Sequence, residues 1–201
     1  MSHNPNFDRF IDQILPDSLA GVRVMDVGHG LGQTGYNFKS LYAIDRGYPV
    51  LYGIEKYSRY HAVCVNNGIY DVLKLQDAAD PWDYPPGYFG VSIAQEVLEH
   101  NPKHKALKII ENMEYYTNGL IIVTTPIGVD PSPAGRHGNP LSEHKSIWYR
   151  RDFTDLGFNT NNVMVAHTSK AVNWFAKFYY RLKGRDISGK VIAWKWVKGG
   201  K

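Results

Sequence analysis

VRVMDVGHGLGQTG, residues 22–35, runs from an apolar segment into a turn with a glycine at every second position. Its first six residues, 22–27, are typical of a short buried strand. Gly28, Gly30 and Gly32 remove side chains where the backbone must turn sharply or approach a ligand. A helix is expected to follow at once, and the free N–H groups at its start would point into the turn. The pattern predicts a cradle for a charged or nucleotide-like ligand, and a strand-to-helix turn that merely needs glycine is the alternative.

Length and composition indicate one globular domain. The chain has 201 residues, of which 43% are hydrophobic, which is enough for a single well-filled core. No segment reaches the roughly 18 consecutive apolar residues of a membrane span, and the first ten residues lack the basic and apolar blocks of a secretory signal. We therefore expect a cytoplasmic protein without a transmembrane segment. The single cysteine, Cys64, lies in an apolar helical stretch, which predicts a packed thiol.

The net charge of +4 is unevenly distributed along the chain. Residues 1–144 hold 11 Lys and Arg against 16 Asp and Glu, a balance of −5, and residues 145–201 hold 12 against 3, a balance of +9. Basic and aromatic residues alternate in the segment 169–185, which we interpret as a helical insertion. This region could contact nucleic acid or another anionic surface, and a packed cap helix with solvated lysines is the other interpretation. No pattern indicates an oligomeric state.

Apolar periodicity predicts strands that alternate with helices. This alternation implies an α/β fold, a doubly wound, mostly parallel, seven-stranded sheet with helices on both faces. The whole chain, 1–201, is read as one domain in which the proline- and glycine-rich residues 126–147 form a lid loop. The expected strands are 22–27, 50–54, 72–75, 91–94, 119–124, 163–166 and 191–197, and the expected helices begin near residues 7, 33, 60, 103 and 148.

Acidic residues stand where four of the predicted strands end. Ligands of a doubly wound sheet bind outside the carboxyl ends of the strands, so these acids would line one crevice. An acid that ends the second strand can accept both ribose hydroxyls, and an acid after the third strand can accept an adenine amino group. Together they indicate an adenosine, although each acid alone could cap a helix or a loop. The four are Asp26, Glu55, Asp77 and Glu96.

Two kinds of adenosine cofactor fit the glycine turn. Gly30, Gly32 and Gly35 have the G-x-G-x-x-G spacing of a dinucleotide site, with Glu55 twenty residues further on, which keeps an NAD(P)-dependent reductase as an alternative. In that fingerprint, however, the first glycine directly follows the strand. Here the glycine in that position is Gly28, which begins G-x-G-x-G and not G-x-G-x-x-G. Asp26 at the strand end would repel a pyrophosphate. A sulfonium cofactor that carries an ammonium group has the opposite preference.

Three motifs resemble those of the class I S-adenosylmethionine-dependent methyltransferases: DVGHGLG at residues 26–32, GIE at 53–55 and SIAQEVLEH at 92–100. EHKSIWYRRDFTDLGF, at 143–158, is similar to a carboxyl-terminal stretch common in that family. The resemblance covers most of residues 20–167. It implies a Rossmann-like sheet and S-adenosyl-L-methionine as the cofactor.

The resemblance also assigns roles to residues near the strand ends. It places the glycine turn and Asp26 at the methionine part of the cofactor, Glu55 at the ribose and Gln95 beside the reacting methyl group. Asp77 with Ala78 would hold the adenine. His29 departs from the family pattern, in which small or acidic residues are frequent at that position. The expected cofactor-binding residues are Asp26, Gly28, Gly30, Gly32, Glu55, Lys56, Asp77, Ala78 and Gln95.

Methyl transfer chiefly requires alignment of the acceptor behind the methyl group, so we expect neither a covalent catalytic residue nor a metal ion. A general base helps when the acceptor is a hydroxyl. His144 and His100 are the candidate catalytic residues, and Glu99 and Glu143 are carboxylate alternatives. For Glu99 and His100 a structural hydrogen-bonded link at a helix start is the favoured interpretation. Glu143 and Trp148 are candidate substrate contacts, although Trp148 could also be a core residue.

The resemblance implies transfer of a methyl group to an O or N nucleophile and leaves the acceptor open, because a fold does not determine the substrate. A chain of this length has no room for a separate RNA-binding module, which favours a small molecule or a glycan as acceptor. A protein that binds S-adenosylmethionine without transferring its methyl group is the main alternative.

Overall fold

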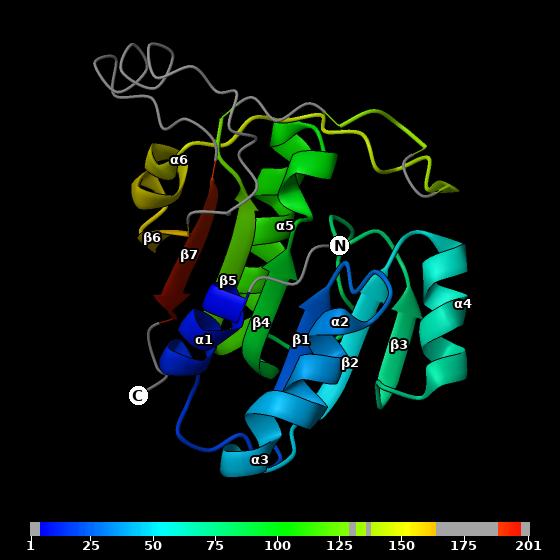
Figure 1. Ribbon diagram of the computed structural model, residues 1–201, viewed down its shortest axis with the longest axis vertical. Coiled ribbons are helices and arrows are strands. Elements are labelled where there is room, and N and C mark those ends of the chain that lie inside the picture. Colours follow the sequence, from blue (N-terminus) through cyan, green and yellow to red (C-terminus); the bar gives the residue numbers. More distant parts are fainter. Residues whose placement is uncertain (1–4, 129–131, 136–137, 164–188, 198–201) are drawn as a thin grey trace.

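The computed structural model describes residues 5–128, 132–135, 138–163 and 189–197, which form a single seven-stranded sheet with flanking helices (Figure 1). The strands are β1 (Arg23–Val27), β2 (Val50–Glu55), β3 (Val72–Leu75), β4 (Phe89–Gln95), β5 (Thr117–Pro126), β6 (Asn159–Val163) and β7 (Lys190–Trp196). Their order is β3-β2-β1-β4-β5-β7-β6. The first five strands in this order, β3, β2, β1, β4 and β5, pair in parallel with their neighbours. Strand β7 is antiparallel to both β5 and β6. The predicted mostly parallel sheet of seven strands is confirmed.

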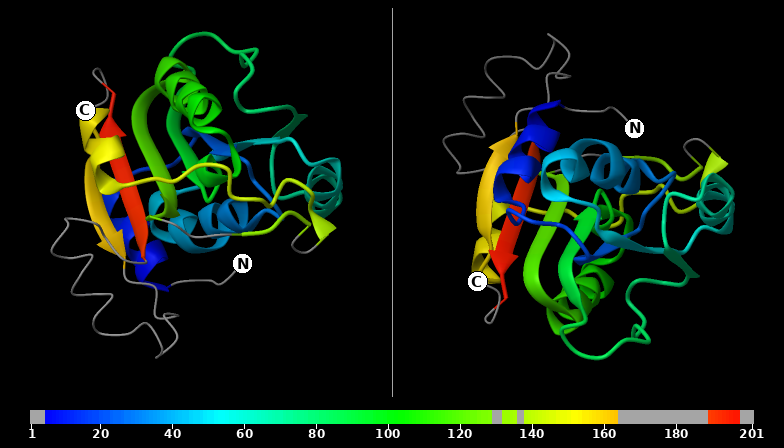
Figure 2. Two further views of the ribbon diagram at one scale, coloured as in Figure 1. Left: turned by 90° about the horizontal axis from the view of Figure 1, so that it is seen from above. Right: turned by 90° about the horizontal axis from the view of Figure 1, so that it is seen from below.

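Helices cover both faces of this sheet, as the views from above and from below show (Figure 2). The helical segments are α1 (Pro5–Ile14), α2 (Gln33–Asn37), the π-helical turn η1 (Phe38–Tyr42), α3 (Ala43–Arg46), α4 (Ser58–Asn67), the 3₁₀ turn η2 (Leu98–His100), α5 (Lys103–Tyr116) and α6 (Arg150–Asp155). Residues of α1, η1 and α4 share one apolar cluster, and residues of α5 share the other. No helix within the described ranges is long and apolar enough to cross a membrane.

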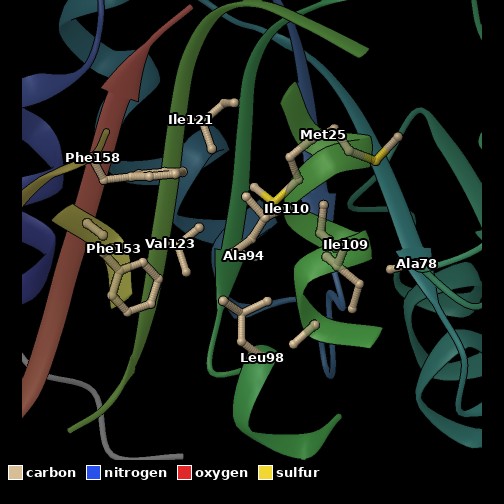
Figure 3. Close-up of a cluster of buried hydrophobic side chains, with 14 of the residues drawn as sticks. Met25, Ala78, Ala94, Leu98, Ile109, Ile110, Ile121, Val123, Phe153 and Phe158 are labelled. Atoms are coloured by element: carbon tan, nitrogen blue, oxygen red, sulfur yellow. The ribbon is translucent and has the colours of Figure 1, made fainter. Parts of the chain in front are cut away.

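The two apolar clusters lie on opposite faces of the central strands. In one of them, Ile109 and Ile110 of α5 pack against Met25 of β1 and Ala94 of β4 (Figure 3). The other contains Cys64, which is fully buried, so the prediction of a packed thiol is confirmed. Strands that are covered on both faces are apolar along their whole length, which is why they were recognisable in the sequence.

The sixth strand does not lie where its apolar residues predicted it. We expected residues 163–166, but β6 is Asn159–Val163, and residues 164–166 lie outside the described part of the chain. The sequence NTNNV is polar, yet β6 stands at the sheet edge and pairs only with β7. Residues 159–161 are exposed or half-buried, so polar side chains are tolerated in this edge strand. The expected insertion at 169–185 also lies outside the described residues.

Candidate functional site

The glycine turn after β1 has the geometry that its sequence predicted. Gly28, Gly30 and Gly32 have φ angles of 70°, 54° and 89°, in the left-handed region that favours glycine. A Cβ on Gly28 would lie 2.6 Å from Cγ2 of Val97, and α2 begins directly after the turn, at Gln33. The turn therefore needs glycine both for its backbone angles and for close packing against the segment that follows β4.

We expect Gly28→Ala to lower the free energy of unfolding by about 2–4 kcal/mol, because a left-handed alanine costs roughly 1–2 kcal/mol and overpacking adds a similar amount. Urea unfolding measures this loss. In a Val97→Ala background the packing part should disappear and the backbone part should remain. Gly68→Ala is the matched control, since Gly68 has a φ of 60° and a Cβ there would meet no atom within 4 Å. An equal cost of Gly28→Ala in both backgrounds would contradict the close contact with Val97.

Glu55, the last residue of β2, closes the glycine turn. Its Oε2 accepts the N–H of Gly30 at 3.0 Å, and its Oε1 accepts the N–H of Tyr57 at 2.7 Å. Burial raises the pKa of Glu55, and these backbone donors oppose the rise. Each carboxylate oxygen offers two lone-pair sites, and the N–H groups of Gly30 and Tyr57 use one site on each, with the N–H of Lys56 also directed at the carboxylate. Glu55 can therefore hold the turn and still accept a ligand hydroxyl.

Asp26 lies one residue before the end of β1 and is almost fully buried. Its Oδ2 accepts the hydroxyl of Tyr70 at 2.5 Å, and the same phenol oxygen accepts the N–H of Gly35 at 3.2 Å. Burial and the neighbouring Glu55 raise the pKa of Asp26 to about 7, although the hydrogen bond from Tyr70 lowers it. Tyr70 joins the strand end to α2. Sequence reasoning missed it because no motif marks the residues that follow α4.

His29 is the residue at which the sequence departs from the family pattern, and the structure shows how its ring is accommodated. The ring is buried, with its centroid 5.2 Å from that of Tyr70. A Cβ on Gly53 would lie 2.9 Å from Cδ2 of His29, so the glycine of the GIE motif leaves room for the ring. Burial lowers the pKa of His29 to about 4, which leaves the side chain neutral at pH 7.

Asp77, two residues beyond β3, is already engaged by two lysines. Its Oδ2 accepts Nζ of Lys56 at 2.6 Å and Nζ of Lys105 at 2.5 Å, and its Oδ1 accepts the N–H of Ala79. Burial would raise the pKa of Asp77, but the two lysine hydrogen bonds outweigh it and lower the pKa. The two lysines use both acceptor sites of Oδ2, and Ala79 uses one of the two on Oδ1, which leaves one site on Oδ1 for a further donor. Lys105, on α5, was not predicted from the sequence.

Gln95 ends β4 beside the glycine turn. Its Oε1 accepts the hydroxyl of Thr34, in the first turn of α2, at 2.7 Å. Strand β4 pairs with β1, and β1 pairs with β2, so Gln95, Asp26 and Glu55 stand at the carboxyl ends of three adjacent strands. The structure thus brings the predicted residues of this set together.

The predicted lid loop, residues 126–147, runs across the same edge of the sheet in its described parts (Figures 1 and 2). At one end the N–H groups of Lys145 and Ser146 donate to the carbonyl oxygen of Glu99, at 2.7 and 3.1 Å. Further back in the loop, the carbonyl oxygen of Gly138 accepts a hydrogen bond from the hydroxyl of Tyr57, at 2.8 Å. The loop therefore reaches from η2 to the start of α4, over the strand ends.

The candidate catalytic histidines lie side by side. The rings of His100 and His144 are edge to face, with centroids 4.9 Å apart. Nδ1 of His100 lies 3.2 Å from the carbonyl oxygen of Glu143, whose own side chain is exposed. Glu99 is 2% exposed and accepts the hydroxyl of Thr125 at 2.9 Å. His100 of η2 thus contacts His144 and the backbone of Glu143 in the lid loop. These contacts link the two segments and gather Glu99, His100 and His144 into one polar cluster.

Trp148 belongs to the core. It is fully buried, its indole stacks on Phe153 at 5.0 Å, and Nζ of Lys103 lies 3.4 Å from the ring centroid. The position of Trp148 supports its interpretation as a core residue, because a fully buried side chain cannot contact a substrate. Its indole N–H donates to Ser146, so it also anchors the end of the lid loop.

The chain matches no protein-family model and no curated protein. Its fold, however, matches solved structures. The [4+2]-cyclase SpnF shares 18% identity at a TM-score of 0.60, over 94% of this chain and 81% of that one. Phosphoethanolamine N-methyltransferase 2 of Haemonchus contortus, in complex with phosphomonomethylethanolamine and S-adenosylhomocysteine, shares 14% identity at a TM-score of 0.65, over 97% of this chain and 53% of that one.

A third structure of this fold has the cofactor named by the sequence resemblance bound to it. Magnesium protoporphyrin IX methyltransferase of Synechocystis, with bound S-adenosylmethionine, shares 15% identity at a TM-score of 0.58, over 96% of this chain and 79% of that one. At such identities the likeness establishes the fold alone. This chain therefore has the Rossmann-like fold of the class I S-adenosylmethionine-dependent methyltransferases.

Proposed function

We propose that this protein is an S-adenosylmethionine-dependent methyltransferase that acts on an O or N nucleophile of a small molecule or a glycan. The observation that carries the proposal is the carboxylate of Glu55. It closes a left-handed glycine turn through Gly30 and can still accept a ligand hydroxyl, at the strand ends of a fold in which solved structures hold this cofactor. Strand ends of this kind are where doubly wound sheets bind nucleotides.

The residues fit the parts of such a cofactor. Glu55 would accept the two ribose hydroxyls, the ionised form of Asp26 would attract the ammonium group, and Gln95, held by Thr34, would border the methionine part. When bound, the cofactor supplies an electrophilic methyl group on a sulfonium. The protein's share of the reaction is then to align the acceptor and exclude water.

His100 and His144 are the residues that we propose to act on the acceptor proton. Burial lowers the pKa of His100, so its ring is neutral at pH 7. A carbonyl oxygen can only accept, so the contact with Glu143 assigns the ring hydrogen to Nδ1 and leaves the lone pair on Nε2. A neutral imidazole with such a lone pair can take a proton from a hydroxyl acceptor.

A small acceptor is supported by the state of the basic residues near the carboxyl terminus. Lys190 pairs with Glu96 at 2.5 Å, and Lys195 pairs with Glu114. These two lysines are therefore neutralised within the described part of the chain. Nucleic acid or an anionic surface is the less supported partner, since the segment 169–185 that would contact it lies outside the described residues.

Calorimetric titration with S-adenosylhomocysteine tests the proposal, and we expect one molecule to bind per chain. A folded protein that binds NADPH and not S-adenosylhomocysteine would overturn it in favour of a reductase. Transfer of a radiolabelled methyl group to a panel of hydroxyl and amine acceptors then separates an enzyme from a cofactor-binding protein. That second candidate is favoured by one observation, namely that a cyclase has the same fold at 18% identity, so the fold does not guarantee methyl transfer.

A further inference from the structure

One carboxylate and two imidazoles converge where η2 meets the lid loop. Ligand atoms of Glu99, His100 and His144 all lie within 4.8 Å of one another. Two donors on one tetrahedral ion, each at about 2.1 Å, are about 3.4 Å apart, so side-chain adjustments on the order of 1 Å bring all three onto one ion. Mixed carboxylate and imidazole ligands are typical of divalent transition-metal ions.

The hydrogen bonds around the cluster orient its members as metal ligands are oriented. Nδ1 of His100 donates to the carbonyl oxygen of Glu143, which turns the lone pair of Nε2 away from that carbonyl. Histidine ligands usually donate their second ring N–H to a carbonyl or a carboxylate in this way. The backbone of His144 is held by its own N–H, which donates to the carbonyl oxygen of Ser132 at 3.1 Å.

The surroundings of Glu99 favour a cation. Glu99 is buried, at 2% exposed, and an anion at such a place is costly unless a cation or hydrogen-bond donors accompany it. The ammonium group of Lys190 makes its ion pair with Glu96. Thr125 donates its hydroxyl to Oε2 of Glu99 and so fixes the carboxylate from the β5 side. A divalent ion beside Glu99 would stabilise the charged form of this buried carboxylate.

The backbone next to the cluster is strained. Glu96 has a φ of 56° and is the one non-glycine residue with a positive φ among the described residues. Such residues occur most often at functional sites, where the surrounding structure holds them in place. The strained turn carries the chain from Gln95, at the candidate cofactor site, to Glu99 within four residues.

We propose that Glu99, His100 and His144 bind one divalent transition-metal ion, and that its open coordination positions face the methyl acceptor. No metal ion was expected from the sequence, and only the tertiary structure brings His144 to Glu99 and His100. A metal ion lowers the pKa of a bound hydroxyl and orients it, which points to an oxygen nucleophile. With the ion bound, Nε2 of His100 is a ligand and no longer a base, so the bound hydroxyl gives its proton to water. Its oxygen then forms the bond to the methyl carbon, and the S–C bond breaks to leave a neutral thioether. This role rests on the proposed function, whereas binding of the ion does not.

The experiment is a titration of the tag-free, metal-stripped full chain with Co²⁺ alone, followed by its visible absorption. We expect one ion per chain and a spectrum that indicates nitrogen ligands. His100→Gln and His144→Gln should each weaken binding by at least about 100-fold, since loss of a partner of a ligand already costs about 10–100-fold. Thr125→Val, which removes only the hydroxyl that holds Glu99, should weaken binding by about 10-fold or more.

His104→Gln is the matched control, because His104 is an exposed histidine in the first turn of α5 and is not part of the cluster. Circular dichroism verifies that each variant is folded. Absence of Co²⁺ binding by the wild type, or equal affinity in the wild type and in His100→Gln and His144→Gln, would overturn the proposal. Titration with S-adenosylhomocysteine on the same preparations keeps the two proposals apart, because a chain that binds Co²⁺ and not the cofactor product contradicts only the proposed function.

Discussion

Glu55→Ala is expected to weaken binding of S-adenosylhomocysteine by about 10²–10⁴-fold. The substitution removes the charged acceptor of two hydrogen bonds that the ribose hydroxyls would donate, and each such bond contributes about 1.5–3 kcal/mol. It also leaves the N–H groups of Gly30 and Tyr57 without the oxygens that accept them. The substitution therefore removes the hydrogen bonds that hold the glycine turn as well as those that would bind the ligand. Calorimetry measures the affinity.

Glu55→Gln separates the two effects. Glutamine keeps the size of the side chain and one acceptor oxygen, so the affinity should fall less than in Glu55→Ala. Glu111→Gln serves as control, since this exposed glutamate pairs with Lys108 on the surface of α5 and should bind the ligand like the wild type. The role of Glu55 would be contradicted by a Glu55→Ala protein that unfolds at the wild-type urea concentration and binds S-adenosylhomocysteine with wild-type affinity.

Asp26→Asn is expected to remove a pH dependence from both stability and cofactor affinity. The pKa of Asp26 is about 7 in the folded protein and about 3.9 in an unfolded chain. Between these values the folded state binds a proton that the unfolded state has lost, so the free energy of unfolding falls as pH rises from about 4 to 7. Each pKa unit corresponds to about 1.4 kcal/mol, which makes the fall a few kcal/mol.

Ligand binding should depend on pH with the opposite sign. Above pH 7 Asp26 is ionised and attracts the ammonium group of S-adenosylhomocysteine, so we expect the affinity of the wild type to rise by up to about tenfold between pH 6 and 8. In Asp26→Asn the affinity should stay flat over this range. Tyr70→Phe removes the hydrogen bond that lowers the pKa of Asp26, and should move the rise to higher pH.

Urea unfolding at pH 5 and pH 8, with calorimetry at pH 6 and pH 8, measures both effects. Asp83→Asn is the control, because the side chain of Asp83 is fully exposed and its replacement should leave the wild-type pH dependence intact. If stability and affinity depended on pH in Asp26→Asn as they do in the wild type, another group would be responsible and the prediction would be wrong.

Most of the fold could be predicted because the buried strands carry their own signal. Strands β1, β4 and β5 are covered on both faces, so each reads as an apolar run bounded by turn residues. Strand β6 has no such cover. Its position follows from pairing with β7, and the apolar residues further along the chain drew the prediction away from the polar stretch that forms the strand.

The candidate site was predictable to the extent that it depends on strand ends. Glu55 and Gln95 are the last residues of their strands, and the parallel topology places such residues at one edge. Tyr70 and Lys105 were missed because each reaches the edge from an element that carries no motif. Both nevertheless affect the charge of the acids at this edge of the sheet. Tyr70 donates a hydrogen bond to Asp26, and Lys105 forms an ion pair with Asp77.

The sequence by itself determined the glycine turn and the acids that follow the strands, because backbone angles, apolar periodicity and strand polarity are local properties of the chain. Only the tertiary structure decided which side chains meet. It buried Trp148 in the core, paired Asp77 with two lysines and brought His144 of the lid loop against Glu99 and His100. Such contacts join residues that are far apart along the chain, and they form only when the sheet and its connecting loops pack together.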